Sequence, residues 1–344
     1  MKVRLKDVAA RAGVAVNTAS TILNRRPNSW ASKETSERVF AAAEQLGYKP
    51  NRAAVALRSG KFNAIGLLIP DLHNPFYTSF ADLIEEEADK RGYDVILESW
   101  RVNLAREAHC LNDLLDRQID GIATFLSDQV VHHDFLSEQF KRHRPIVAIH
   151  NTGGEPLPVD SVLTDFSGGL RAAVEALHRR GHRRYAFLCA LAKGQDDGRR
   201  PELFGQMLAD KGIAAGDFDF VRCDHSVESA HAAAAELFGR TQRPTALIAL
   251  NDLSAIGAMR AATERRLRIP EDLSVIGVDD IPLARFLPVA LSTIKQPLAE
   301  MARRVVELLI ERIEQPKKPG VERAVFDATY IERESVGPVP KAKK

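Results

Sequence analysis

The sequence predicts an α/β protein with a separate all-α head at its N-terminus. From residue 63 onward, short and continuous apolar runs alternate with amphipathic segments, a pattern typical of buried parallel strands joined by helices. Before residue 50, the apolar residues instead recur at helical spacing. The chain has 344 residues, 45% of them hydrophobic, which is enough for two or three domains with their own cores.

Residues 4–24 predict two short helices joined by a tight turn. One set of apolar residues has the spacing of a buried helix face, Gly13 breaks the helix, and a second set repeats the spacing. The positions predicted to face inward are Leu5, Val8, Ala9, Ala12, Ala19, Ile22 and Leu23. Two helices joined in this way form a helix-turn-helix, whose second helix can lie in the major groove of DNA.

The outward face of the second helix is small and neutral. Asn can pair bidentately with adenine, Val can contact the methyl group of thymine, and Thr can donate or accept a hydrogen bond. We therefore expect DNA contacts from Val16, Asn17, Thr18, Ser20 and Thr21. The alternative is a small helical hairpin with a solvated polar face, and two short helices alone do not exclude it.

A third helix is predicted from Ser32 to Leu46, with Ser32 as its N-terminal cap. Beyond it, Asn51 can cap a short alanine-rich helix from Arg52 to Arg58. Because so short a helix is not stable alone in water, we expect this segment to act as a joint between the head and the rest of the chain.

The charge is distributed unevenly along the chain. The overall formal charge is +2, but residues 1–60 hold 11 Lys and Arg against four Asp and Glu, a net charge of +7. The remaining residues hold 37 against 42, a net charge of −5. A basic head on a mildly acidic body favours phosphate binding at one end only. A solvated basic domain without a polyanionic partner is the alternative, and it fits the helix-turn-helix poorly.

The body of the chain predicts two doubly wound parallel sheets in succession, an arrangement that resembles the two-lobe periplasmic-binding-protein fold. The first predicted strands are 64–69, 93–97, 121–125 and 145–149, with helices near 76–91, 104–117 and 132–142. The second series has strands 184–189, 245–250 and 273–278, with helices near 168–180, 200–211, 228–239 and 253–266. Segment 292–297, helix 298–314 and a strand over 321–331 would cross back between the lobes.

Metal sites and membrane spans are not expected. Cys110, Cys189 and Cys223 are far apart and form no CxxC pair, and the pair His132 and His133 has no ligand partner at helical spacing. No apolar run approaches the roughly 20 residues that a membrane span needs. The N-terminus reads as a helix-turn-helix and not as a signal peptide. We expect a cytoplasmic protein that lies at the bacterial nucleoid.

The chain resembles the lac repressor (LacI/GalR) family over nearly all of its length. The motifs that carry the resemblance are LKDVAARAGV, NTAS, ILN and ERVFAAAEQLGYKPNRAAVALRSG, in that order. The sequence departs from the family at Arg4 and Ala15, where the family usually has hydroxyl residues that cap the two helices. Each helix start should lose roughly 1 kcal/mol of capping as a result. Ala15 also removes a phosphate contact, and Ala19 replaces a usual valine.

The resemblance implies a role for the predicted joint. In the family this segment is a hinge helix that orders on the operator and pairs with its copy in the minor groove. Leu57 matches the family leucine that wedges between base pairs and kinks the DNA, and Arg52 and Arg58 would then lie beside phosphates. A plain linker with an incidental leucine is the alternative.

Candidate ligand-binding residues follow the predicted strands, because ligands of open α/β sheets lie beyond the carboxyl ends of the strands. Each candidate lies in a segment that corresponds to a family motif: NPFY, RPELF, CDHS, ND and DD. RPELF has Leu203 in place of the family glycine, and CDHS has a histidine where an aromatic residue is frequent. The candidates are Phe76, Tyr77, Arg200, His225, Asn251 and Asp279, with His150 and Asp165 as weaker ones. Aromatic residues that cap the lobe core, and acids that cap helices, are the alternative explanation.

The expected domains are the head at 1–49, the hinge at 50–61 and an effector-binding core at 62–340. The first lobe would hold 62–163 and 294–325, and the second lobe 164–292 and 326–340. The whole predicts a ligand-responsive regulator, most simply a repressor, that binds a palindromic DNA operator as a homodimer. A sugar-like or sugar-acid-like effector would change its DNA affinity through the hinge. The sequence does not tell whether the effector releases DNA or tightens binding.

Two other classes of protein share parts of this pattern. A transport-type binding protein has the two-lobe fold but would need a signal peptide and would lack residues 1–60. An NAD-dependent enzyme also alternates strands and helices, yet no GxGxxG follows a strand, and no clustered base and nucleophile are visible. We therefore expect neither an enzyme nor a cofactor.

Overall fold

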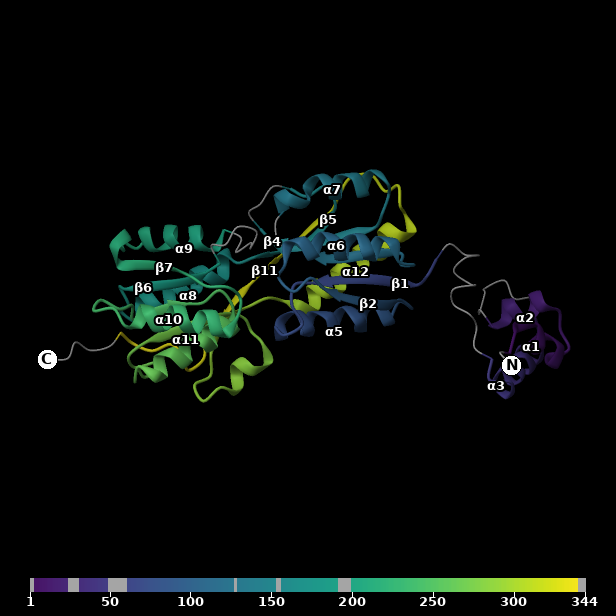
Figure 1. Ribbon diagram of the computed structural model, residues 1–344, viewed down its shortest axis with the longest axis horizontal. Coiled ribbons are helices and arrows are strands. Elements are labelled where there is room, and N and C mark those ends of the chain that lie inside the picture. Colours follow the sequence, from purple (N-terminus) through teal and green to yellow (C-terminus); the bar gives the residue numbers. More distant parts are fainter. Residues whose placement is uncertain are drawn as a thin grey trace. The chain divides into compact units, whose positions relative to one another are not determined.

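The computed structural model describes residues 3–23, 31–48, 61–126, 129–152, 156–190 and 199–339. The chain divides into two compact units, residues 1–63 and 64–344. The ribbon in Figure 1 shows a small helical unit near the N-terminus and a larger α/β unit that holds the rest of the chain.

The head is a bundle of three helices, as predicted. Its helices are α1 (Leu5–Ala12), α2 (Val16–Leu23) and α3 (Lys33–Gln45). They share an apolar core that includes Val8, Ala19 and Val39, each of which has no exposed surface. Gly13 ends α1 in the left-handed conformation, with φ of 66°, that suits glycine. The Ser32 side chain accepts a hydrogen bond from the backbone N–H of Thr35 and caps α3, which confirms that part of the prediction.

The start of α1 compensates in part for its missing hydroxyl cap. The backbone N–H of Arg4 donates to the Asp7 carboxylate at 2.8 Å. A carboxylate in the first turn also interacts favourably with the positive end of the helix dipole. Asp7 thus adds a stabilising contact at this helix start, and the expected loss from the missing hydroxyl at Arg4 stays a prediction.

The core contains two six-stranded sheets, so the predicted fold class is confirmed. The first sheet has the order β11-β5-β4-β3-β1-β2 and the second has the order β12-β10-β9-β8-β6-β7. Neighbouring strands are parallel, except that β12 runs antiparallel to β10. The strands of the first sheet are β1 (Ala64–Ile69), β2 (Asp94–Ser99), β3 (Gly121–Phe125), β4 (Ile146–Asn151), β5 (Asp160–Asp165) and β11 (Arg323–Asp327). Those of the second sheet are β6 (Tyr185–Cys189), β7 (Phe218–Arg222), β8 (Ala246–Ile248), β9 (Ser274–Asp279), β10 (Ser292–Lys295) and β12 (Thr329–Ile331).

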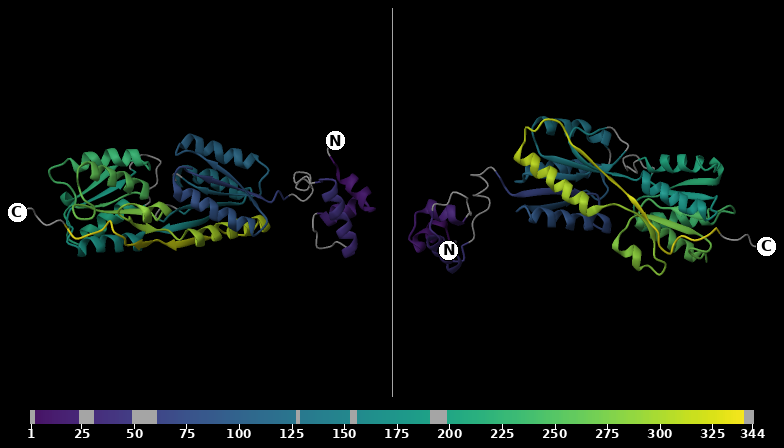
Figure 2. Two further views of the ribbon diagram at one scale, coloured as in Figure 1. Left: turned by 90° about the horizontal axis from the view of Figure 1, so that it is seen from below. Right: turned by 180° about the vertical axis from the view of Figure 1, so that it is seen from behind.

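Helices cover both faces of each sheet (Figures 1 and 2). In the first lobe these are α5 (Pro75–Asp89), α6 (Leu104–Asp116), α7 (Gln129–Lys141) and α12 (Leu298–Glu314). In the second lobe they are α8 (Ser167–Arg179), α9 (Arg200–Ala209), α10 (Val227–Phe238) and α11 (Asp252–Glu264). Two short 3₁₀ helices, η1 (Ala215–Asp217) and η2 (Pro282–Phe286), lie in connections of the second lobe. No described helix is long and apolar enough to span a bilayer.

The alternation of side chains along each central strand sorts these helices into layers. In β1, Ile65 and Leu67 pack with α5 and α12, whereas Leu68 packs with α6 and α7. In β6, Phe187 packs with α8 and α9, whereas Leu188 packs with α10 and α11. Because successive residues of a strand point to opposite faces, a continuous apolar run is needed wherever both faces are covered.

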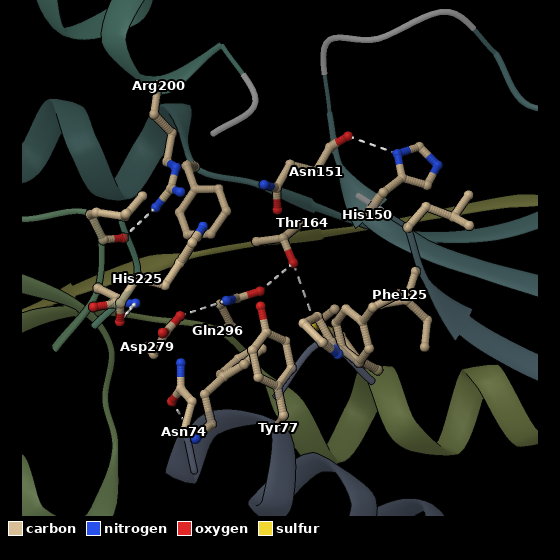
Figure 3. Close-up of a pocket in the computed structure, with 18 residues that line it drawn as sticks. Asn74, Tyr77, Phe125, His150, Asn151, Thr164, Arg200, His225, Asp279 and Gln296 are labelled. Carbon is tan, nitrogen blue, oxygen red and sulfur yellow. Dashed lines mark hydrogen bonds between the residues drawn. The ribbon is translucent and has the colours of Figure 1, made fainter. Parts of the chain in front are cut away.

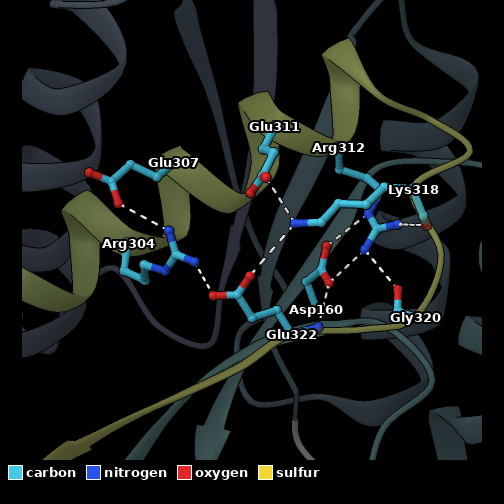
Figure 4. Close-up of polar contacts among 8 residues, drawn as sticks. All are labelled: Asp160, Arg304, Glu307, Glu311, Arg312, Lys318, Gly320 and Glu322. Atoms are coloured by element: carbon cyan, nitrogen blue, oxygen red, sulfur yellow. Dashed lines mark hydrogen bonds and ion pairs between the residues drawn. The ribbon is translucent and has the colours of Figure 1, made fainter.

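Segments near the C-terminus complete both lobes, and Figure 2 shows them passing from one lobe to the other. α12 packs on the first sheet, β11 pairs with β5, and β12 pairs with β10. A buried ion pair fixes this return (Figure 4): Arg312 Nη2 and Nε donate to the two carboxylate oxygens of Asp160 at 2.8 and 2.9 Å. The backbone N–H of Glu322, just before β11, donates to the same carboxylate at 2.8 Å.

Two features of the core differ from the prediction. The strands β5 and β7 were not expected, because polar residues interrupt their apolar pattern. The single strand expected over 321–331 is wrong: Ala328 separates β11 from β12, which belong to different sheets.

Candidate functional site

The exposed face of α2 carries four of the five side chains predicted to contact DNA. Val16, 46% exposed, and Asn17 are open to solvent, while Thr18 and Thr21 are half-buried. The Thr21 hydroxyl donates to the Asn17 carbonyl oxygen at 2.9 Å, within the same helix. These side chains keep the small, neutral surface that reading of base edges requires.

Ser20 is the exception, because its side chain is largely buried in the head; its contact with DNA stays a prediction. Only 7% of its surface is exposed. α2 packs against both α1 and α3, so the buried arc of the helix is wider than one apolar stripe and includes Ser20 beside Ala19. The predicted hinge residues Arg52, Leu57 and Arg58 lie outside the described residues.

A cleft between the two lobes brings together all six predicted ligand residues. The space between its walls is about 680 Å³, which includes space open to solvent. Its walls also include polar side chains of both lobes that were not predicted as ligand contacts. The complete lining is Pro70, Asn74, Phe76, Tyr77, Phe125, Leu126, Ile149, His150, Asn151, Thr164, Phe166, Arg200, His225, Leu250, Asn251, Asp279, Gln296 and Met301.

The start of α5 forms the aromatic part of the first-lobe wall. The Asn74 side chain caps α5 by accepting from the backbone N–H of Phe76 at 3.0 Å, and Pro75 occupies the first turn. Phe76, Tyr77 and Phe125 pack edge to face, with ring centroids 5.0 to 6.2 Å apart. Burial, and secondarily the charge of Asp279, raises the pKa of Tyr77, so its hydroxyl stays protonated at neutral pH. Figure 3 shows this hydroxyl pointing toward Gln296.

Arg200 supplies the cleft with a permanent positive charge from the second lobe. It is the first residue of α9 and is 7% exposed. Its Nη1 donates to the carbonyl oxygen of Leu250 at 2.8 Å, and its guanidinium lies 4.9 Å from the ring centroid of Phe166. These contacts fix the plane of the guanidinium before any ligand arrives, which suits it to a carboxylate or to paired hydroxyls.

Asp279 ends β9 in an unusual backbone conformation. Its φ is +107° and that of Asp280 is +55°, and such positive values are costly for residues other than glycine. Asp279 accepts from Gln296 Nε2 at 2.9 Å, whereas Asp280 pairs with Arg333. The two neighbouring carboxylates therefore serve different partners. Burial raises the pKa of Asp279 to about 7, against opposing effects of Gln296 and Arg200.

A second carboxylate, Asp252, lies behind Asp279 and has no exposed surface. It accepts from the Thr293 hydroxyl at 2.7 Å and from the backbone N–H of Ile281 at 2.8 Å. Burial, followed by the charge of Asp279, raises its pKa well above the usual range. Gly277 makes room for it: a Cβ at that position would lie 2.1 Å from Asp252 Oδ1.

Two histidines of the cleft are neutral near physiological pH. Burial lowers the pKa of His225 and of His150 to about 4. Asn251 caps α11 through Ser254 N at 2.7 Å, and its Nδ2 donates to the carbonyl oxygen of His225 at 3.4 Å. Among the described residues, no group of three potential ligands could hold a metal ion.

Thr164 and Gln296 are cleft residues that the sequence did not reveal as candidates. The Thr164 hydroxyl, from β5, donates to Gln296 Oε1 at 2.7 Å, and Gln296 in turn donates to Asp279 in β9. This chain of hydrogen bonds joins the two sheets across the floor of the cleft (Figure 3). The sequence indicates this contact only through the segment 292–297, which contains Gln296 and is predicted to pass between the lobes.

Comparison with known proteins identifies the family. Residues 4–51 match the lacI family of bacterial regulatory proteins, and residues 174–336 match a periplasmic binding protein-like domain. The HTH-type transcriptional repressor PurR of Erwinia tasmaniensis is 31% identical over 339 residues, which cover 98% of this chain and 97% of that protein.

Solved structures agree with this assignment. The lac repressor dimer bound to operator and the anti-inducer ONPF matches with a TM-score of 0.84 at 26% identity, over 98% of this chain and 100% of that chain. A LacI family regulator from Enterococcus faecium with bound ribose matches with a TM-score of 0.70 at 27% identity, over 80% and 99% of the two chains. The predicted resemblance is thus confirmed, and the chain belongs to the LacI family of ligand-responsive, DNA-binding bacterial regulators.

Proposed function

We propose that this regulator reads its operator with Val16, Asn17, Thr18 and Thr21, and senses a small hydroxylated metabolite in the cleft between its lobes. The observation that carries the proposal is the convergence of Arg200, Asp279 and the aromatic side chains of α5 on one cleft. The metabolite would act as an effector on DNA affinity, and the cleft residues would carry no catalytic role. The protein would act at the nucleoid.

The composition of the cleft favours a sugar or a sugar acid as the effector. The rings of Tyr77 and Phe125 offer apolar surface to the face of a sugar ring. Asp279, Gln296 and Asn151 offer hydrogen-bond acceptors and donors to its hydroxyl groups. Arg200 can bind paired hydroxyls or a carboxylate. The structure of the Enterococcus faecium relative with bound ribose supports the same chemical class.

The effector can change DNA affinity only by favouring one arrangement of the lobes over another. The side chains that would contact the effector come from both lobes. Closure of the cleft around the effector would therefore move the strands of one lobe relative to those of the other. The coupling is reciprocal: if the effector weakens DNA binding, DNA weakens effector binding by the same factor. The hinge residues Arg52, Leu57 and Arg58 are the proposed route to the head.

The decisive experiment screens the full chain by thermal shift against pentoses, hexoses and their acids, with D-ribose included. Each compound that stabilises the protein is then added at saturation to a fluorescence-anisotropy titration of a DNA site obtained by selection. A compound that binds and shifts the DNA dissociation constant supports the proposal. If no sugar or sugar acid binds but the fluorescence of NADH changes on mixing, the result contradicts the proposal and supports an NAD-dependent enzyme.

Family members bind DNA as dimers, and we propose that η2 contributes to the contact between copies. Phe286 and Leu283 are 76% and 50% exposed, large values for apolar side chains on a short helix. Phe286→Ser should weaken dimerisation by more than about tenfold in sedimentation experiments, because aromatic residues often dominate interfaces. Val325→Ser, at an exposed apolar side chain of β11, is the matched control and should leave the dimer intact.

A further inference from the structure

We infer that binding of an uncharged, hydroxylated effector in the cleft releases a proton from Asp279 to solvent, so that the response to such an effector weakens as the pH falls below neutrality. The inference rests on the proposed function and adds to it the protonation state of one cleft residue. The reaction is Asp279–COOH plus a ligand hydroxyl giving Asp279–COO⁻ hydrogen-bonded to that hydroxyl, plus H⁺.

One carboxyl oxygen of Asp279 already accepts a hydrogen bond from the protein, and the other is available to a ligand. Gln296 Nε2 donates to Asp279 Oδ1 at 2.9 Å, and Thr164 holds Gln296 in that orientation at 2.7 Å. In the part of the chain that the structure describes, no hydrogen-bond donor is found for Asp279 Oδ2. Both carboxylate and neutral acid can accept at Oδ1, so the second oxygen is where the two protonation states differ.

Charged and titratable groups from several helices, strands and loops lie around Asp279. α9 contributes Arg200, which favours the carboxylate, and α11 contributes Asp252, whose own pKa is raised by burial and by the charge of Asp279. Tyr77 on α5 stays protonated, and His225, which precedes α10, is neutral. The adjacent Asp280 is paired with Arg333 and lies 4.0 Å from Lys295, so its charge is compensated. Burial is therefore the effect that favours the protonated form of Asp279, against Arg200 and Gln296.

A hydroxylated ligand changes this balance. Its O–H groups donate to a carboxylate more strongly than to a neutral acid, because hydrogen bonds to a charged acceptor are about twice as strong. The ligand therefore favours the ionised form of Asp279. An anionic ligand paired with Arg200 would do the opposite and would retain the proton.

The direction of proton transfer separates Asp279 from the cleft histidines. His150 and His225 have pKa values of about 4, so they carry no proton to release between pH 6 and 8. If a ligand instead charged a histidine, the complex would take up a proton from solvent. Release and uptake have opposite signs in calorimetry.

The size of the effect follows from linkage. With a pKa of about 7 in the empty cleft and an ionised acid in the complex, binding releases about 0.9 proton at pH 6 and about 0.1 at pH 8. The dissociation constant should then be about tenfold larger at pH 6 than at pH 8.

The test is isothermal titration of the full chain with D-ribose at pH 6, 7 and 8, each in two buffers that differ in ionisation enthalpy. We expect proton release that decreases with pH in the wild type, none in Asp279→Asn, and unchanged release in Asp280→Asn as the matched control. Binding with no proton exchange, with uptake, or with release that persists in Asp279→Asn would overturn the inference while leaving the proposed function in place.

A ligand-free measurement makes the two proposals separable. In carbon-13 spectra of the labelled full chain, the carboxyl signal that is lost in Asp279→Asn should titrate near pH 7. Titration below pH 5 would overturn the inference whatever the ligand. If D-ribose fails to bind at every pH, the pentose branch of the proposed function fails and the inference falls with it for that ligand class.

Discussion

The outer face of α2 and the wall of the cleft both serve to recognise a ligand, yet they are built in opposite ways. On α2, Val16 and Asn17 are exposed, carry no charge and are bonded to little beyond their own helix. In the cleft, Arg200, Asp279 and Gln296 are buried and already bonded. Each side chain of the first site can act independently, whereas those of the second act as a network, whose members depend on one another.

The largest effect should come from the buried side of this comparison. Arg200→Ala should weaken effector binding by about 2–5 kcal/mol, since it removes a desolvated, hydrogen-bonded cation from the cleft. DNA affinity without effector should stay nearly the same. Arg199→Ala is the control, because Arg199 is half exposed and pairs with Glu202 outside the cleft lining. If Arg200→Ala still responds fully at the wild-type effector concentration, Arg200 does not bind the effector.

The next effect concerns stability, and it tests the network without any ligand. A carboxyl whose pKa is raised on folding, as that of Asp279 is, costs stability progressively as the pH rises through the folded value of about 7. Asp279→Asn keeps an acceptor for Gln296 and removes that cost. The variant should therefore gain about 2–3 kcal/mol in unfolding free energy, relative to the wild type, between pH 5 and pH 8. Denaturant unfolding at both pH values measures this, and parallel curves for the two proteins would contradict it.

A smaller and more local effect is expected on the exposed side. Asn17→Ala should relax preference at one base-pair position of each half-site by roughly 1–3 kcal/mol, with other positions unchanged. Binding-site selection with the variant and with wild type measures the position-specific loss. A uniform loss over all sequences would mean that Asn17 contacts the backbone of the DNA and reads no base.

The smallest effect is expected at Ser20, whose side chain has little exposed surface. Ser20→Ala should change base preference by less than about 0.5 kcal/mol, because a side chain with so little exposed surface offers little contact to a base edge. Val16→Ala in the same selection experiment provides the contrast. If Ser20→Ala altered preference as much as Val16→Ala, α2 would have to rotate on DNA.

The two sites also differ in how far the sequence could predict them. The α2 face follows from helical periodicity within eight residues, and only the burial of Ser20 was not predicted, since α2 also contacts α3, which lies far along the chain. The strand runs 64–69 and 121–125 were predicted to the residue, because both are continuous and apolar.

Buried polar residues explain what the sequence did not reveal. β5 contains Asp160, Ser161 and Thr164, all almost without exposed surface, and two of their partners, Arg312 and Gln296, follow more than 130 positions later. Hydropathy treats such residues as signs of a loop, since their partners are invisible before folding. Thr164 and Gln296 were missed as cleft residues for the same reason, although six cleft residues were found from motifs at strand ends.

The late position of α12 and β11 has a consequence for how the protein is made. The face of the first sheet that bears Ile65 and Leu67 is covered in part by α12, and its outer edge beside β5 is closed only by β11. A ribosome that has finished β5 has therefore produced a lobe with an open strand edge and an apolar face that lacks part of its cover. Such surfaces favour association with other chains. Synthesis that stops before residue 298 should yield an aggregation-prone product, although every strand from β1 to β5 is present.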